Sequence, residues 1–141
     1  MISIAHDALQ QIREHGARAY PEECCGVMLG RGEDEGRTIL AVFPVDNVQE
    51  SNRNRRFLVS PEQYVEAEKT ATGRGMDLMG FYHSHPDHPA APSAYDTAHA
   101  LPWFTYVIVS VREGKPDELT AWTLREDRER FEQNAVEIRK E

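Results

Sequence analysis

The chain has 141 residues and a net charge of −8 at neutral pH, which argues against the broad basic face that a nucleic-acid binder needs. This length predicts one domain, residues 1–141, able to bury roughly two-thirds of its unfolded surface. No apolar run approaches the ~18 residues of a membrane span, and no signal-peptide pattern opens the chain. The only cysteines, Cys24 and Cys25, are adjacent and so are not expected to bridge. We therefore expect a cytoplasmic protein with no membrane partner.

The first third of the chain predicts one helix followed by a hairpin. Small and apolar residues at helical spacing indicate a helix over residues 7–19, which Pro21 ends. Residues 24–29 form a short apolar run typical of a buried strand, and residues 37–45 are rich in β-formers. The polar turn at residues 32–36 would join these two strands.

The middle of the chain predicts a surface loop, a second helix and a buried strand. Residues 47–56 are polar and should form the loop, and residues 57–59 a brief strand. Ser60 would cap a helix over residues 61–73 that begins with a proline. Residues 77–82 are mostly apolar and indicate a buried strand.

The last third predicts further strands. Residues 105–111 are the most apolar strand, and a turn at residues 114–117 leads to a returning strand at residues 119–124. Residues 130–140 fit either a helix or a strand, and we favour an edge strand. With a short helix at residues 94–100, the elements predict an α/β fold with a mixed sheet of six or seven strands.

Three histidines follow the buried strand at residues 77–82: His83, His85 and His88. Residues two apart on a strand point the same way, so His83 and His85 share one face. Two imidazoles side by side at a strand end can each offer a ring nitrogen to one cation. The pattern therefore predicts a zinc site, although the same pair could be ordinary polar surface.

A catalytic zinc ion usually has three protein ligands and one water. The residues leave three candidates for the third ligand: His88, Asp96 and His99. Asp96 would lie in the first turn of the short helix and could return toward the strand end, with His99 on the same helix face. Ser93 and Asp96 also fit a capping box, which needs no metal.

A zinc hydrolase also needs a general base, typically a glutamate. Glu22 and Glu23 precede a buried strand, so either could be held at the edge of the sheet, or both could be solvated linker residues. Spacing alone does not choose between them. Cys25 could serve as a nucleophile, but the strand pattern indicates a small buried hydrophobe.

Together these stretches resemble the JAMM (MPN+) zinc metallopeptidases, and in particular the small free-standing bacterial members. The family pattern is a glutamate, then much later His-Ser/Thr-His, seven residues, Ser, two residues and Asp. The chain meets this spacing throughout, with Glu23, His83-Ser84-His85, Ser93 and Asp96. The flanking Pro21-x-Glu23-x-Cys25-Gly26 is also similar to these members.

The resemblance implies a fold and a mechanism. The fold would be a single, cytidine-deaminase-like MPN domain. It would contain a curved, mixed, mostly antiparallel sheet flanked by helices. His83, His85 and Asp96 would bind one catalytic zinc ion. Glu23, rather than Glu22, would be the general base, and Ser93 would donate a hydrogen bond to the oxyanion.

The resemblance also implies a class of substrate. Family members cleave peptide or isopeptide bonds after the C-terminal tail of ubiquitin-like proteins, and the small bacterial members are associated with sulfur-carrier proteins ending in Gly-Gly. The expected partner is such a carrier or its C-terminal adduct, and the enzyme could be a monomer or a homodimer. Arg53, Arg55 and Arg56 could contact an acidic carrier or simply lie in a solvated loop.

Two other functions remain open from the sequence. Family members that lack the metal residues act as non-catalytic scaffold modules, although the ligand set is intact here. A zinc hydrolase of another substrate class, such as a nucleobase deaminase, would carry His-x-Glu with Pro-Cys-x-x-Cys, and this chain does not.

Overall fold

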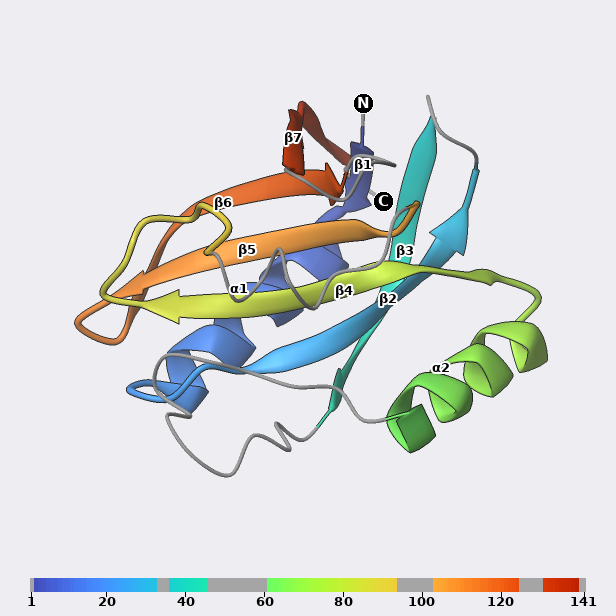
Figure 1. The fold of residues 1–141 in the computed structure, drawn as a ribbon, viewed down its shortest axis with the longest axis horizontal. Helices are drawn as coiled ribbons and strands as arrows, with labels where there is room; N and C mark the ends of the chain where they lie inside the picture. The colour runs from blue at the N-terminus through green and yellow to red at the C-terminus, as the bar shows by residue number, and fades with distance from the viewer. Residues whose placement is uncertain (1, 33–35, 46–60, 94–102, 125–130, 140–141) are drawn as a thin grey trace.

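The computed structural model describes residues 2–32, 36–45, 61–93, 103–124 and 131–139. This part of the chain forms one mixed sheet of eight strands with two helices, in the strand order β7-β6-β5-β4-β2-β3-β1-β8 (Figure 1). The strands are β1 Ile2–Ala5, β2 Cys25–Arg31, β3 Arg37–Val45, β4 Asp77–Pro86, β5 Thr105–Arg112, β6 Lys115–Leu124, β7 Phe131–Asn134 and β8 Val136–Arg139. The helices are α1 His6–Ala19 and α2 Pro61–Gly73.

The sheet is mixed and mostly antiparallel, as predicted. The pairs β2–β3, β2–β4, β5–β6 and β6–β7 are antiparallel, whereas β1–β3, β1–β8 and β4–β5 are parallel. Strand β4 lies at the centre, between antiparallel β2 and parallel β5. Its C-terminal end therefore meets the N-terminal end of β2, and this is where the predicted site lies.

The end of the chain supplies both edges of the sheet. β7 pairs with β6 at one edge, and β8 pairs with β1 at the other, with only Ala135 between β7 and β8. The Ala135 carbonyl accepts a hydrogen bond from the Ile2 N–H at 2.9 Å. The sheet therefore curves until its two edges meet, and β7 and β1 lie together in Figure 1. The sequence predicted one edge strand over residues 130–140, whereas the structure has two, β7 and β8, at opposite edges of the sheet.

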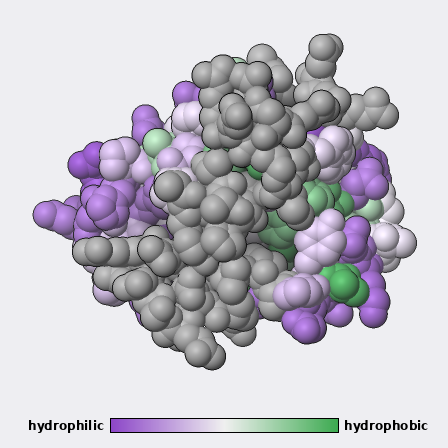
Figure 2. Space-filling view, in the orientation of Figure 1, coloured by the Kyte–Doolittle hydropathy of each residue, from purple (hydrophilic) through white to green (hydrophobic). Residues whose placement is uncertain are grey.

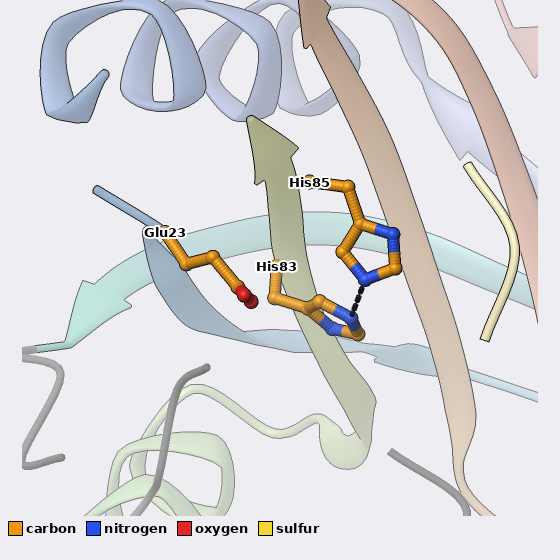
Figure 3. Close-up of side chains that lie close together, drawn as sticks. All are labelled: Glu23, His83 and His85. Atoms are coloured by element: carbon orange, nitrogen blue, oxygen red, sulfur yellow. Dashed lines mark hydrogen bonds between the residues drawn. The ribbon is translucent and has the colours of Figure 1, made fainter. Parts of the chain in front are cut away.

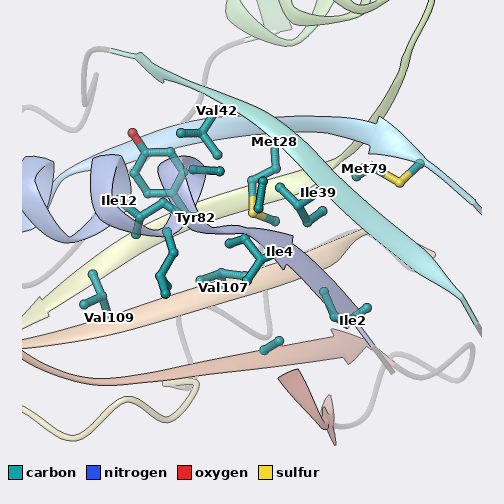
Figure 4. Close-up of a cluster of buried hydrophobic side chains, with 14 of the residues drawn as sticks. Ile2, Ile4, Ile12, Met28, Ile39, Val42, Met79, Tyr82, Val107 and Val109 are labelled. Atoms are coloured by element: carbon teal, nitrogen blue, oxygen red, sulfur yellow. The ribbon is translucent and has the colours of Figure 1, made fainter. Parts of the chain in front are cut away.

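Each helix covers one face of the sheet. Leu9 and Ile12 of α1 join a buried cluster with Met28 and Tyr82 (Figure 4). Two alanines of α2 pack on the opposite face, in a cluster with Val27, Leu29, Phe81 and Tyr106. Figure 2 shows hydrophobic side chains on the surface at the end of the molecule where α2 lies.

A β-bulge in β4 decides which face the histidines occupy. In the β2–β4 ladder Met28 pairs with Gly80 and Leu29 pairs with Leu78, so Met79 is an extra residue. As a result Leu78 and Phe81 lie in the cluster under α2, although an uninterrupted strand would place them on opposite faces. The alternation that restarts after the bulge puts His83 and His85 on the same face as Phe81.

Several predicted boundaries change in the structure. The returning strand β6 begins at Lys115, not at residue 119, because the turn consists of Glu113 and Gly114, both with positive φ. A two-residue turn of this kind lets the strand resume at once, and Pro116 then pairs with Val111. Strand β1 was not predicted, and the last segment forms two strands, β7 and β8, where one was expected, so the described residues form eight strands where six or seven were expected.

Three predicted elements, at residues 47–56, 57–59 and 94–100, lie outside the described residues, as does Ser60. In the described part of the chain, neither helix is long and apolar enough to cross a membrane.

Candidate metal centre

Two buried histidines share the C-terminal end of β4. His83 is 1% exposed and His85 is 8% exposed, and their Nε2 atoms lie 3.2 Å apart (Figure 3). Two nitrogens bound to one tetrahedral zinc ion at about 2.0–2.1 Å would be about 3.3 Å apart. The spacing of the two rings therefore fits a shared cation.

A second hydrogen bond sets the tautomer of His85. Its Nδ1 lies 2.9 Å from the carbonyl oxygen of Pro89, and a carbonyl can only accept. Nδ1 therefore carries the proton, and Nε2 presents its lone pair toward His83. A ligating histidine held through its other nitrogen in this way is the usual arrangement at metal sites in proteins.

A carboxylate completes the group. Glu23 precedes β2 and is only 4% exposed, whereas its neighbour Glu22 is exposed. One oxygen of Glu23 and one nitrogen of each of His83 and His85 all lie within 4.8 Å of one another. In Figure 3 the carboxylate points toward the two rings. The structure thus brings together three of the residues named from the sequence and distinguishes Glu23 from Glu22.

The position of Glu23 is fixed through the next residue. The Cys24 N–H donates to Ser84 Oγ at 2.9 Å, and the Ser84 N–H donates to the Cys24 carbonyl at 3.1 Å. In the β2–β4 ladder Cys25 pairs with His83. Ser84 points away from the histidines that flank it, so one face of β4 carries the imidazoles and the other holds the segment that bears Glu23.

The face of β4 beneath the site is also closely packed. Tyr82 is fully buried, and its hydroxyl lies 2.7 Å from Nδ1 of His15 on α1. Burial, followed by the charge of Arg18, lowers the pKa of His15, and burial raises the pKa of Tyr82. Both groups are therefore neutral near pH 7. This pair was not found from the sequence, because its two residues lie 67 positions apart.

A cavity of about 450 Å³ opens beside the group, lined by Glu23, His85, His88, Pro89, Ala91 and Ser93. Ser93, predicted to assist catalysis, therefore shares the cavity with the general-base candidate and one histidine. His88, weighed above as a ligand, lies on the cavity wall. Asp96 and His99 lie outside the described residues.

The cysteines behave as buried apolar residues. Both are unbridged and buried, and Cys25 Sγ lies 3.6 Å from the Val45 carbonyl. Burial raises the pKa of the Cys24 thiol to about 11, and the charge of Glu23 adds to this. Cys24 is therefore a neutral thiol near pH 7, and the burial of Cys25 confirms its interpretation as a small hydrophobe.

A curved mixed sheet between two helices, with a buried Glu–His–His group where two central strands meet, defines a JAMM-type hydrolase. Residues 5–125 match the family described as prokaryotic homologs of the JAB domain. The chain belongs to this family, which is the one that the sequence motif predicted.

Two curated relatives align over most of the chain. It is 38% identical over 136 residues to the desampylase of Haloferax volcanii, covering 91% of this chain and 92% of that protein. It is 33% identical over 108 residues to a probable TtuB-protein conjugate cleaving protease of Thermus thermophilus, covering 77% and 69%.

Two solved structures share the fold. A protein from Desulfitobacterium hafniense superimposes with a TM-score of 0.86 at 27% identity, covering 100% of this chain and 94% of that one. A JAB1/MPN domain protein from Archaeoglobus fulgidus gives a TM-score of 0.63 at 18% identity, over 99% and 98% of the two chains. The predicted MPN fold is confirmed.

Proposed function

We propose that this chain is a zinc-dependent peptidase that hydrolyses the amide bond following the C-terminal Gly-Gly of a ubiquitin-like protein. The observation that carries the proposal is the buried Glu23 carboxylate within 4.8 Å of the His83 and His85 ligand atoms. A buried carboxylate beside two imidazoles combines a proton acceptor with a metal-binding pair, and a metallohydrolase needs both.

The donor set suits zinc. Imidazole and carboxylate are common zinc ligands, and the 3.2 Å separation of the two Nε2 atoms fits tetrahedral geometry. His83, His85 and, from the sequence motif, Asp96 would hold the ion. Zinc bound there supplies a Lewis acid that polarises the amide carbonyl and activates water at neutral pH.

Glu23 is the proton carrier in this proposal. Its carboxylate accepts a proton from the water that attacks the carbonyl carbon, and later delivers that proton to the departing amine. A C–O bond forms and the C–N bond breaks, leaving the Gly-Gly carboxylate and a free amine. No covalent bond to the protein forms at any point. Ser93 donates a hydrogen bond to the oxygen that becomes negative during the attack.

The proposed substrate is supported by the two relatives, one named a desampylase and the other a probable conjugate-cleaving protease. The alignments cover 92% and 69% of the lengths of these two proteins, so the chain corresponds to most of each of them. We propose a ubiquitin-like sulfur-carrier protein or its C-terminal adduct as the partner. We also propose that residues 1–141 act as one domain in the cytoplasm.

The test is incubation of the zinc-loaded protein with a ubiquitin-like sulfur carrier joined through its C-terminus to a lysine side chain. Mass spectrometry should show release of a carrier that ends in Gly-Gly, and a chelator should abolish the release. A cut at another position would contradict the substrate while leaving the metal site intact.

Measuring the zinc content of the purified protein distinguishes an enzyme from a non-catalytic scaffold module. The proposal predicts that the wild type holds zinc and that a His83→Ala/His85→Ala variant does not. Equal and negligible zinc in both proteins would favour the scaffold.

A further inference from the structure

The cavity beside the metal centre contains one ionisable side chain that the proposed mechanism does not use. His88 is exposed and lines the cavity together with Glu23, His85 and Ser93. We propose that His88 is a substrate-binding residue, whose imidazole N–H donates a hydrogen bond to a main-chain carbonyl of the tail. The inference rests on the proposed function and extends it to recognition of the tail.

The main chain of residues 88–90, which forms the cavity wall that bears His88, is fixed by hydrogen bonds to its carbonyl groups. Ser110 Oγ donates to the His88 carbonyl at 2.6 Å, and Thr120 Oγ1 donates to the Ala90 carbonyl at 2.5 Å. Between these two, the Pro89 carbonyl accepts from His85 Nδ1. Three successive carbonyls are thus bound to β4, β5 and β6, so the main chain of this wall is fixed before a substrate enters.

This wall is further stiffened from β6. Trp122 Nε1 donates to Thr120 Oγ1 at 2.7 Å and so orients the hydroxyl that binds the Ala90 carbonyl. Thr120 and Ala90 are both buried. A side chain on a fixed wall loses little main-chain entropy when it binds a ligand, which makes His88 an effective contact.

The imidazole of His88 is the cavity's available donor. In the described part of the chain, the structure records no hydrogen bond to its ring. The other cavity groups have assigned roles: His85 uses Nδ1 on Pro89 and Nε2 at the metal centre, and an ionised Glu23 can only accept. Ser93 serves the oxyanion in the proposed mechanism. A carbonyl of the tail that enters this cavity therefore finds its partner in His88.

The chemistry of the proposed substrate requires such a donor. Gly-Gly has no side chains, so an enzyme can recognise it only through main-chain N–H and carbonyl groups and through a passage too narrow for larger residues. Pro89 and Ala91 line the cavity with apolar side chains, and His88 provides the polar contact. One neutral hydrogen bond contributes about 0.5–1.5 kcal/mol, which corresponds to a factor of about two to ten in binding.

The experiment compares three histidine variants on a synthetic tail peptide that ends in Gly-Gly and is joined by an isopeptide bond to a lysine side chain. His88→Ala should raise KM about two- to tenfold while kcat stays close to the wild-type value. His88→Gln keeps an N–H donor and should recover most of the loss. His6→Ala alters an exposed histidine of α1 outside the cavity lining and should leave KM unchanged.

Zinc content and melting temperature are measured for each variant as a second readout, and both should equal the wild-type values. Binding of the free tail peptide to the zinc-loaded variants, followed by calorimetry, should weaken in the same order as KM rises. An unchanged KM and unchanged peptide affinity in His88→Ala would overturn the inference alone. A wild type that neither cleaves nor binds the peptide would overturn both the inference and the proposed function.

Discussion

Ser84 and Cys24 hold each other by two hydrogen bonds across the ends of β4 and β2. Ser84 Oγ accepts from the Cys24 N–H at 2.9 Å, and the Ser84 N–H donates to the Cys24 carbonyl at 3.1 Å. Ser84 is fully buried, so neither group can turn to water. This double link sets the distance between Glu23 and the histidines on either side of Ser84.

Replacing Ser84 by alanine tests that link. The Cys24 N–H would become a buried donor without an acceptor, so we expect a loss of about 1–3 kcal/mol in unfolding free energy. Because Glu23 is then less firmly positioned, kcat should fall on the order of tenfold or more, with little change in zinc content. Urea unfolding and steady-state kinetics measure the two effects. Ser84→Thr keeps the hydroxyl and should retain activity, so an equal loss in both variants would remove the hydroxyl from the explanation.

Gly26 leaves room for the ring of Tyr82. A Cβ at position 26 would overlap the Tyr82 ring, which is fully buried and bound through its hydroxyl to His15. We expect Gly26→Ala to lower the unfolding free energy by about 1–3 kcal/mol or more, because the buried ring would have to shift and give up its contact with His15. Gly73→Ala is the matched control, since nothing lies within 4 Å of a Cβ there. Comparable melting temperatures for the two variants would contradict the packing argument.

Asp87 links the segment after β4 to the end of α1 and to the turn between β5 and β6, and gives the fold an acid-sensitive contact. Its Oδ2 accepts from the Tyr20 hydroxyl at 2.5 Å and its Oδ1 from the Glu113 N–H at 2.8 Å. The Tyr20 hydrogen bond, followed by the Glu113 one, lowers the pKa of Asp87 below its ordinary 3.8. A carboxyl with a lowered folded-state pKa stabilises the fold fully above its unfolded pKa, and the contribution disappears as pH falls through the folded value.

Asp87→Asn isolates this contribution. The stability difference between wild type and variant should be constant near neutral pH and should shrink as the pH is lowered below about 3.8. Unfolding by urea at a series of pH values provides the measurement. A difference that stays constant down to about pH 2 would show that the Asp87 charge contributes nothing.

The sequence predicts most of this fold because its patterns are local. The helix at residues 7–19 and the strand at residues 37–45 depend on periodicity and propensity within one segment, and the structure has them at His6–Ala19 and Arg37–Val45. The division of the last segment into two edge strands depends instead on partners far along the chain. β8 pairs with β1, whose residues 2–5 are too few to show a strand pattern on their own.

The site was predicted in the same uneven way. The prediction that His83 and His85 share one face depends only on their local spacing. It holds in the structure because the Met79 bulge lies before both residues. The choice of Glu23 over Glu22 came only from the family resemblance, because adjacent carboxylates have no periodicity of their own. In the structure Glu23 is buried beside the histidines and Glu22 is exposed, and Cys24, next to Glu23, donates a hydrogen bond to Ser84.

The most direct test of the account is the zinc content and turnover of Glu23→Gln, measured on the same preparation. Glu23 lies close enough to both histidines to be a ligand, so the variant separates a base from a ligand. The account predicts wild-type zinc content with kcat lower by on the order of 10²–10⁴, because glutamine cannot accept the proton. Loss of the zinc, or full turnover with the zinc retained, would contradict the role of Glu23 as the general base.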